Sequence, residues 1–179
     1  MMSRTARGFL RAKDGLAAIE FAFIAPILIV LFFGTIEVCN ALICRQKVTT
    51  MASSAADLVA QDSAITGSQV NDVFSAINAI VYPYPSTGAK IIITSLIGDP
   101  LHAGKYVVDW SVAQNTTAHT KGASMNVPTG LLTVGGSVIL AEITYTYNSH
   151  TTEMITGPLS MSDIFYARPR KGAQVKYTP

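Results

Sequence analysis

The sequence predicts an α+β protein in which a long N-terminal helix is followed by a small head, with one helix packed on a three- to four-stranded antiparallel sheet. Three patterns predict this fold. An apolar stretch covers residues 16–44 and continues as an amphipathic pattern to about residue 62. A second helical pattern lies between residues 66 and 80, a β-branched apolar segment follows from residue 91, and segments with a two-residue period follow from residue 106. The length of 179 residues allows one small domain with an appendage.

The composition narrows the class of protein. Hydrophobic residues make up 49% of the chain and charged residues only 13%, against about 25% charged residues in ordinary soluble domains. A net charge of +2 is too small to predict nucleic acid as a partner. Two cysteines in 179 residues exclude a scaffold built on disulfides. The composition also excludes a disordered chain, because the apolar content is too high.

The apolar stretch predicts a transmembrane helix over residues 16–44. Residues 21–36 contain no charge, and the whole stretch is interrupted only by Glu20, Glu37 and Asn40. A helix of about 20 apolar residues spans a bilayer core. The core helix of a soluble protein is the alternative, and the length of the stretch disfavours it.

The placement of basic residues predicts the orientation of this helix. Residues 1–15 form a basic leader, after which the next basic residues are Arg45, Lys47 and then Lys90. The positive-inside rule therefore predicts a cytoplasmic N-terminus and an exported head. A cleaved secretory signal fits poorly, because its apolar core is about 7–15 residues long. The basic residues of the leader are Arg4, Arg7, Arg11 and Lys13.

The junction between the leader and the apolar stretch carries a distinctive motif. Gly15 is followed by an apolar residue, and Glu20 stands five residues after the glycine. This arrangement resembles the processing site of type IV pilins and pseudopilins. More narrowly, the chain resembles the TadE-like proteins of tight-adherence pilus systems. The segments that carry this resemblance are Gly15–Ala22, Ala25–Pro26 and Gly34–Glu37, with Ile143–Tyr147 and Tyr166–Arg170 near the C-terminus.

The resemblance implies a pseudopilin or minor pilin that helps to assemble a tight-adherence (Flp-type) pilus. A prepilin peptidase would cleave between Gly15 and Leu16, and Glu20 would then meet the free amine of a neighbouring subunit. The implied location is the bacterial inner membrane, with a periplasmic head that can be incorporated in an extracellular pilus. The implied partners are the prepilin peptidase, the inner-membrane assembly platform, other pilins and membrane lipid. No cofactor and no enzymatic activity are implied.

The residues of the motif fit this chemistry on physical grounds. A carboxylate in hydrocarbon costs several kcal/mol unless it lies near the interface or has a partner. Cleavage after Gly15 would create an ammonium at Leu16, one helical turn from Glu20 and on the same face. Glycine lets the backbone enter a peptidase cleft in an extended form, because it has no Cβ. The alternatives are that Glu20 snorkels at the boundary of an ordinary signal anchor and that Gly15 only begins a helix.

Other residues of the apolar stretch predict structure rather than chemistry. Pro26 removes a backbone donor, so it predicts a kink in the helix. Glu37 lies seventeen residues after Glu20, or about 26 Å along a helix, and the two are not a catalytic pair. Cys39 and Cys44 are about 140° apart around a helix and cannot bridge each other. We expect buried thiols there, with an intermolecular disulfide as the alternative.

The exported portion divides into three predicted segments. Apolar residues at intervals of three and four predict an amphipathic continuation of the helix over residues 45–62. Residues 63–167 form the α+β head, with strands expected at 91–97, 106–112 and 139–147. Its helix is predicted to begin with a cap, either Thr66 with Gln69 or Ser68 with Asn71, and to bury Val70, Val73, Phe74, Ile77 and Ile80. Residues 168–179 form a basic tail, expected to be solvated, with docking to an acidic partner as the alternative.

Catalytic and metal-binding patterns are weak throughout the chain. His102, His119 and His150 stand far apart without clustered cysteines or carboxylates, so the sequence predicts no metal site. A triad of Ser124, His119 and Asp109 can be drawn, but no nucleophile-elbow motif accompanies it. No nucleotide-binding glycine motif occurs either. Two other functions remain open: an uncleaved signal-anchored envelope protein with a binding head, and an exported hydrolase.

Overall fold

The computed structural model describes residues 15–99, 105–128, 131, 136–149 and 157–179. The basic residues of the predicted leader, together with His102 and His150, lie outside these residues. The chain divides into two units between Asn40 and Ala41. We call residues 15–40 the anchor segment and residues 41–179 the head unit, and each is described separately.

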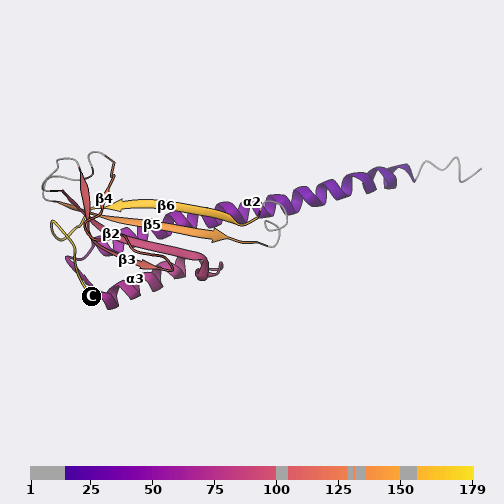
Figure 1. Ribbon diagram of the computed structural model, residues 1–179. Coiled ribbons are helices and arrows are strands. Elements are labelled where there is room, and N and C mark those ends of the chain that lie inside the picture. Colours follow the sequence, from indigo (N-terminus) through magenta and orange to yellow (C-terminus); the bar gives the residue numbers. More distant parts are fainter. Residues whose placement is uncertain (1–14, 100–104, 129–130, 132–135, 150–156) are drawn as a thin grey trace, which may run out of the picture. The chain divides into compact units, whose positions relative to one another are not determined.

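The described elements are two α-helices, a short 3-10 helix and seven strands, and they confirm the predicted α+β fold. Helix α2 covers Leu16–Ala60 and crosses the boundary between the two units. In the head unit (Figure 1), α2 is followed by β1 (Ala64–Thr66), α3 (Gly67–Ile80), η1 (Ser86–Gly88), β2 (Ala89–Gly98), β3 (Tyr106–Gln114), β4 (Ser124–Met125), β5 (Ser137–Tyr147), β6 (Leu159–Ala167) and β7 (Lys176–Thr178).

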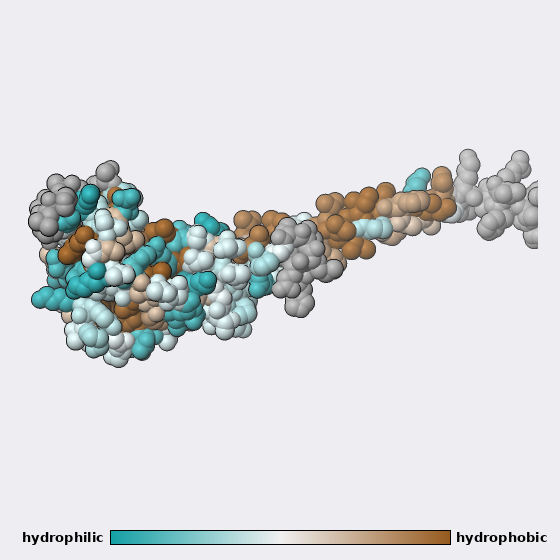
Figure 2. Space-filling model, viewed as in Figure 1, coloured by the Kyte–Doolittle hydropathy of each residue, from teal (hydrophilic) through white to brown (hydrophobic). Residues whose placement is uncertain are grey.

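The anchor segment is a helix whose apolar side chains are exposed all around. Phe23 and Val30, for example, are 75% and 71% exposed, and hydrophobic residues cover most of this helix in Figure 2. A helix satisfies its backbone hydrogen bonds internally, so it is stable in a medium that supplies none. The hydroxyl of Thr35 is also satisfied within the helix, because it donates to the carbonyl of Leu31 at 2.7 Å. Among the described residues, α2 is the one helix long and apolar enough to cross a membrane.

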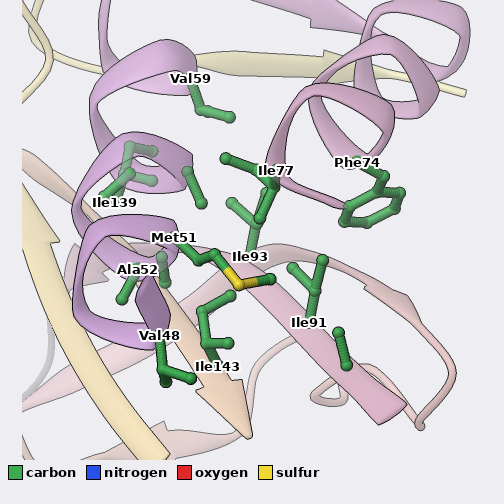
Figure 3. Close-up of a cluster of buried hydrophobic side chains, with 14 of the residues drawn as sticks. Val48, Met51, Ala52, Val59, Phe74, Ile77, Ile91, Ile93, Ile139 and Ile143 are labelled. Atoms are coloured by element: carbon green, nitrogen blue, oxygen red, sulfur yellow. The ribbon is translucent and has the colours of Figure 1, made fainter. Parts of the chain in front are cut away.

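In the head unit, α2 and α3 pack on one face of the main sheet and form the principal core (Figure 3). The apolar residues of α2 recur at intervals of three and four, so they line one face of the helix. That face is buried against Ile91 and Ile93 of β2 and Ile139 and Ile143 of β5. Most of the apolar positions expected on the amphipathic continuation are buried, whereas Leu58 is 38% exposed. The buried residues of α2 are Cys44, Val48, Met51, Ala52, Ala55, Ala56, Val59 and Ala60.

Helix α3 begins with the predicted cap. The hydroxyl of Thr66 accepts a hydrogen bond from the backbone N–H of Gln69, and the side-chain oxygen of Gln69 accepts one from the backbone N–H of Thr66. This reciprocal pair is a capping box. At the other end of α3, the Nζ of Lys47 donates to the carbonyl of Ile80 at 3.0 Å. The predicted apolar face is also confirmed, with Val70, Phe74 and Ile77 buried and Val73 and Ile80 partly buried.

The main sheet is antiparallel, and its strand order is β4-β3-β2-β5-β6. The three strands expected from the sequence are its central strands β3, β2 and β5. Two further strands extend the sheet beyond the predicted three or four. The two residues of β4 are too few to show a period, and the sequence of β6 mixes apolar and polar residues without regular alternation.

A β-bulge in the main sheet changes which side chains share a face. Ser95 of β2 pairs with Trp110, whereas the next residue, Leu96, pairs with Val108. The intervening Asp109 is therefore an extra residue in β3. As a result Trp110 belongs to the core under the helices. Val108 belongs to a second cluster with Leu96, Val138 and Leu140. The regular alternation of residues 106–112 predicted one face for both residues, and that prediction is wrong at the bulge.

The C-terminal segment is part of the fold rather than a solvated tail. Residues Lys176–Thr178 form β7, which pairs with β1 in a parallel two-stranded sheet. Val175 is fully buried, and its carbonyl accepts a hydrogen bond from the Nε1 of Trp110 at 2.7 Å. The expectation of a solvated terminus is therefore wrong around Val175, because these residues close the core beside Trp110.

Candidate assembly site on the N-terminal helix

The proposed cleavage position lies at the beginning of α2. The carbonyl of Gly15 accepts a hydrogen bond from the backbone N–H of Ile19 at 3.2 Å, and the helix begins with the next residue, Leu16. A Cβ built on Gly15 would meet nothing within 4 Å, and the backbone there does not have the left-handed conformation that favours glycine. The fold of this chain therefore does not itself require glycine at this position.

Glu20 lies one turn into the helix, on the face that also carries Leu16. Both side chains are exposed, and residues four apart are neighbours on a helix surface. Among the described residues, no cation forms a salt bridge with Glu20. The structure thus brings Gly15, Leu16 and Glu20 together in the first turns of α2, and it places the acidic side chain on a surface that is otherwise apolar.

The other singled-out residues of α2 lie apart from this group. Pro26 lies inside the helix, and the kink it predicts stays a prediction. Glu37 is half-buried. The two thiols differ: Cys44 is buried, as expected, whereas Cys39 is exposed on the anchor segment.

The polar residues of the head unit do not form the triad that can be drawn from the sequence. The Nε2 of His119 lies 2.5 Å from a carboxylate oxygen of Glu142, and the backbone N–H of His119 donates to the hydroxyl of Ser111. Asp109 instead pairs with Lys121, at 3.5 Å. Ser124 is exposed on β4. No local pattern indicates the pairing of His119 with Glu142, because the two residues are 23 positions apart and the loop after β3 carries His119 to β5, which is not a neighbour of β3 in the sheet.

Two depressions on the head unit offer little for catalysis. One, of about 440 Å³, lies between α2 and β6, and Asp57 and Arg170 form an ion pair at its wall. Another, of about 560 Å³, is lined by Asp109, Ser111, His119, Lys121 and Tyr177, among others. No group of three or more His, Cys, Asp or Glu among the described residues could hold a metal ion. The candidate functional site is therefore the group of Gly15, Leu16 and Glu20 in the first turns of α2.

Comparison with protein families assigns residues 15–57 to the family described as TadE-like protein. The comparisons with curated proteins and with solved structures each gave no match. The matched segment begins at Gly15 and covers nearly all of α2. The match supports a pilin-like role associated with tight-adherence pili, in a membrane-anchored protein. It confirms the resemblance predicted from the sequence: the segment that carries Gly15, Leu16 and Glu20 is TadE-like.

Proposed function

We propose that this protein is a pseudopilin or minor pilin subunit for the assembly of a tight-adherence pilus. It is made as a precursor and cleaved between Gly15 and Leu16 by a prepilin peptidase, and its head lies on the periplasmic side of the inner membrane. The observation that carries this proposal is a coincidence of boundaries. The TadE-like match and the exposed apolar helix both begin at residues 15–16, where the cleavage motif lies.

Cleavage creates a positively charged partner for the carboxylate of Glu20. An acidic side chain at the centre of a membrane helix costs about 2.5–3.5 kcal/mol on insertion scales, so an unpaired Glu20 is disfavoured wherever its helix is drawn into an apolar environment. Cleavage gives every subunit an ammonium at Leu16, so the Glu20 of one subunit can pair with the Leu16 amine of the next. This pairing is strongest where packed helices exclude water, because the local dielectric constant is low. Glu20 then favours the assembled state over the isolated subunit.

The exposed apolar surface of the anchor segment suits both the membrane, before assembly, and the filament, after assembly. Before assembly, lipid tails cover its apolar side chains. In the filament, the same side chains pack against the helices of other subunits. The sequence has no nucleotide-binding motif, so the energy for extraction comes from the inner-membrane assembly platform.

The cleavage step is tested by the N-terminal residue of the mature protein, measured by mass spectrometry. We expect the wild-type protein to begin at Leu16 and Gly15→Asp to remain uncleaved. Gly34→Ala is the matched control, because a Cβ at Gly34 also meets nothing within 4 Å, and it should be cleaved normally. A membrane form of the wild-type protein that still begins at Met1 would contradict the proposal and favour an uncleaved signal anchor.

The assembly step is tested by Glu20→Ala. This variant should be cleaved normally, yet it should form at least about tenfold fewer pili, because the pairing between the carboxylate and the Leu16 amine of the next subunit is lost. Electron microscopy counts the pili, and Glu20→Asp serves as the control that keeps a carboxylate. Pili at wild-type number in Glu20→Ala would rule out the pairing with Leu16, even if cleavage were normal.

A further inference from the structure

Exposed apolar side chains gather at the end of the head unit where α2 enters it. Tyr82 is 77% exposed, Leu42 60%, Ile43 47% and Leu159 38%. These residues come from α2, from the segment after α3 and from β6. Together with the exposed cations Arg45 and Lys90, we call them the proximal patch.

Several contacts place these residues at one end of the head unit. The Nζ of Lys47 donates to the carbonyl of Ile80, two residues before Tyr82, so the part of α2 that begins the head unit lies beside the end of α3. The hydroxyl of Tyr145, near the end of β5, donates to the carbonyl of Pro85 at 3.0 Å.

Strand register adds β2 and β6 to this end. Tyr145 pairs with Ala89, the neighbour of Lys90. Tyr147 pairs with Leu159. The start of β2, the end of β5 and the start of β6 therefore all meet the start of α2 in the head unit.

The charged side chains within the segments that form this end are all positive, whereas Glu142 and Asp163 pair in register with Ile92 and Ile143 at the edges of these segments. The segments 41–48, 80–92, 143–149 and 157–161 contain Arg45, Lys47 and Lys90 and no Asp or Glu. Asp163 lies farther along β6, where its carboxylate accepts a hydrogen bond from the hydroxyl of Thr49. At the other end of α2, by contrast, acidic Asp57 and Asp62 pair with Arg170 and Lys171.

We propose that the proximal patch rests on the surface of an anionic phospholipid bilayer. Tyrosine favours the level of the headgroups, because its ring is apolar and its hydroxyl is polar. Lysine and arginine near an anionic surface each contribute about 1 kcal/mol. The covalent chain keeps the proximal patch close to the membrane surface, because Arg45 lies only nine residues, or about 14 Å along a helix, after Ile36, the last residue of the uncharged apolar stretch. The proposal requires the membrane-anchored helix but neither cleavage nor pilus assembly.

The test uses the full chain in vesicles that contain phosphatidylglycerol and lipids brominated near the headgroup end of the acyl chain, because bromine quenches tryptophan fluorescence. The native Trp110 is buried beside Val175, away from the patch, and supplies a constant background. Tyr82→Trp reports on the patch. Lys171→Trp is the control at the opposite end, where the lost ion pair with Asp62 is exposed and worth little. Phe33→Trp reports on insertion of the anchor segment.

We expect quenching of Tyr82→Trp to exceed that of Lys171→Trp by at least about threefold. Adding Arg45→Gln and Lys90→Gln, or replacing phosphatidylglycerol with phosphatidylcholine, should reduce the excess by at least half, because the attraction to anionic lipid is lost. Equal quenching of Tyr82→Trp and Lys171→Trp, with Phe33→Trp quenched, overturns the proposal and leaves the membrane anchor intact. That result would indicate that water or another subunit covers the patch. A lack of quenching in Phe33→Trp would overturn the anchor and the patch together.

Discussion

At the scale of single residues, Tyr145 shows how a buried polar group depends on its surroundings. The side chain is 2% exposed, and its hydroxyl has a partner in the carbonyl of Pro85. Burial raises the pKa of Tyr145 to about 12, with smaller contributions from Cys44 and Tyr84. The neutral phenol is therefore favoured in the folded head unit, because an ionised oxygen would lose its hydration there.

The raised pKa predicts a loss of stability in strong base. In the unfolded chain Tyr145 ionises near its ordinary pKa of 10.0, whereas in the fold it keeps its proton to about pH 12. The contribution of Tyr145 to the free energy of unfolding is complete below pH 10 and is lost as the pH rises towards 12. Thermal unfolding in detergent should show that the free energy of unfolding falls by on the order of 1 kcal/mol over this pH range. Tyr145→Phe should show a smaller loss, and an equal loss in both proteins would assign the effect to other groups.

At the scale of elements, α2 shows how one helix meets two environments. In the anchor segment, apolar residues occur all around the helix, which is typical of a span in lipid. In the head unit, they occupy one face and pack against the sheet. Both patterns are local properties of the sequence, so both halves of this helix could be predicted from it.

The start of α3 carries a prediction at the same scale. Thr66→Ala removes one acceptor of the capping box and should lower the unfolding free energy of the head unit by about 1 kcal/mol. Ser75→Ala is the control, because Ser75 is also exposed and only donates to the carbonyl of Asn71 within the helix. Chemical denaturation in detergent compares the two variants. Equal stabilities would mean that the cap contributes little to the fold.

At the scale of the whole molecule, the C-terminal segment closes the head unit. Val175 is buried and accepts the hydrogen bond of Trp110, and the backbone N–H of Arg170 donates to the carbonyl of Ala60 at 2.8 Å. The rings of Trp110 and Tyr177 lie 5.5 Å apart. The segment thus joins the end of α2 to the middle of β3.

Deleting residues 175–179 should therefore destabilise the entire head unit. We expect a loss of at least about 3 kcal/mol, because a buried valine, an aromatic contact and a buried hydrogen bond are removed together. The fluorescence of Trp110, the single tryptophan of the chain, should shift to the red as water reaches the ring. Lys176→Gln changes an exposed residue of the same strand and should leave the spectrum unchanged. An unshifted spectrum in the deletion variant would contradict this account of the closure.

Three features of the fold that local patterns do not predict share a cause. The bulge at Asp109 moves Val108 to the other face of the sheet, and a regular two-residue period cannot reveal it. The strand β7 has three residues, and it forms because β1 lies beside it. The partner of His119 is fixed by the placement of Glu142 on β5. In each case the deciding contact joins segments that are far apart in the chain.

The sequence by itself determined the helix from Leu16, its apolar and amphipathic parts, the cap of α3, the central strands and the TadE-like motif. These features depend on neighbouring residues, because hydrophobic periodicity, capping and a short sequence motif extend over a few turns or one strand. The tertiary structure alone decided the five-stranded order, the burial of Val175 and the gathering of Tyr82, Leu159 and Lys90 around the first turns of α2 in the head unit. Those arrangements depend on which distant segments pack together to bury apolar surface, and that information is spread over the whole chain.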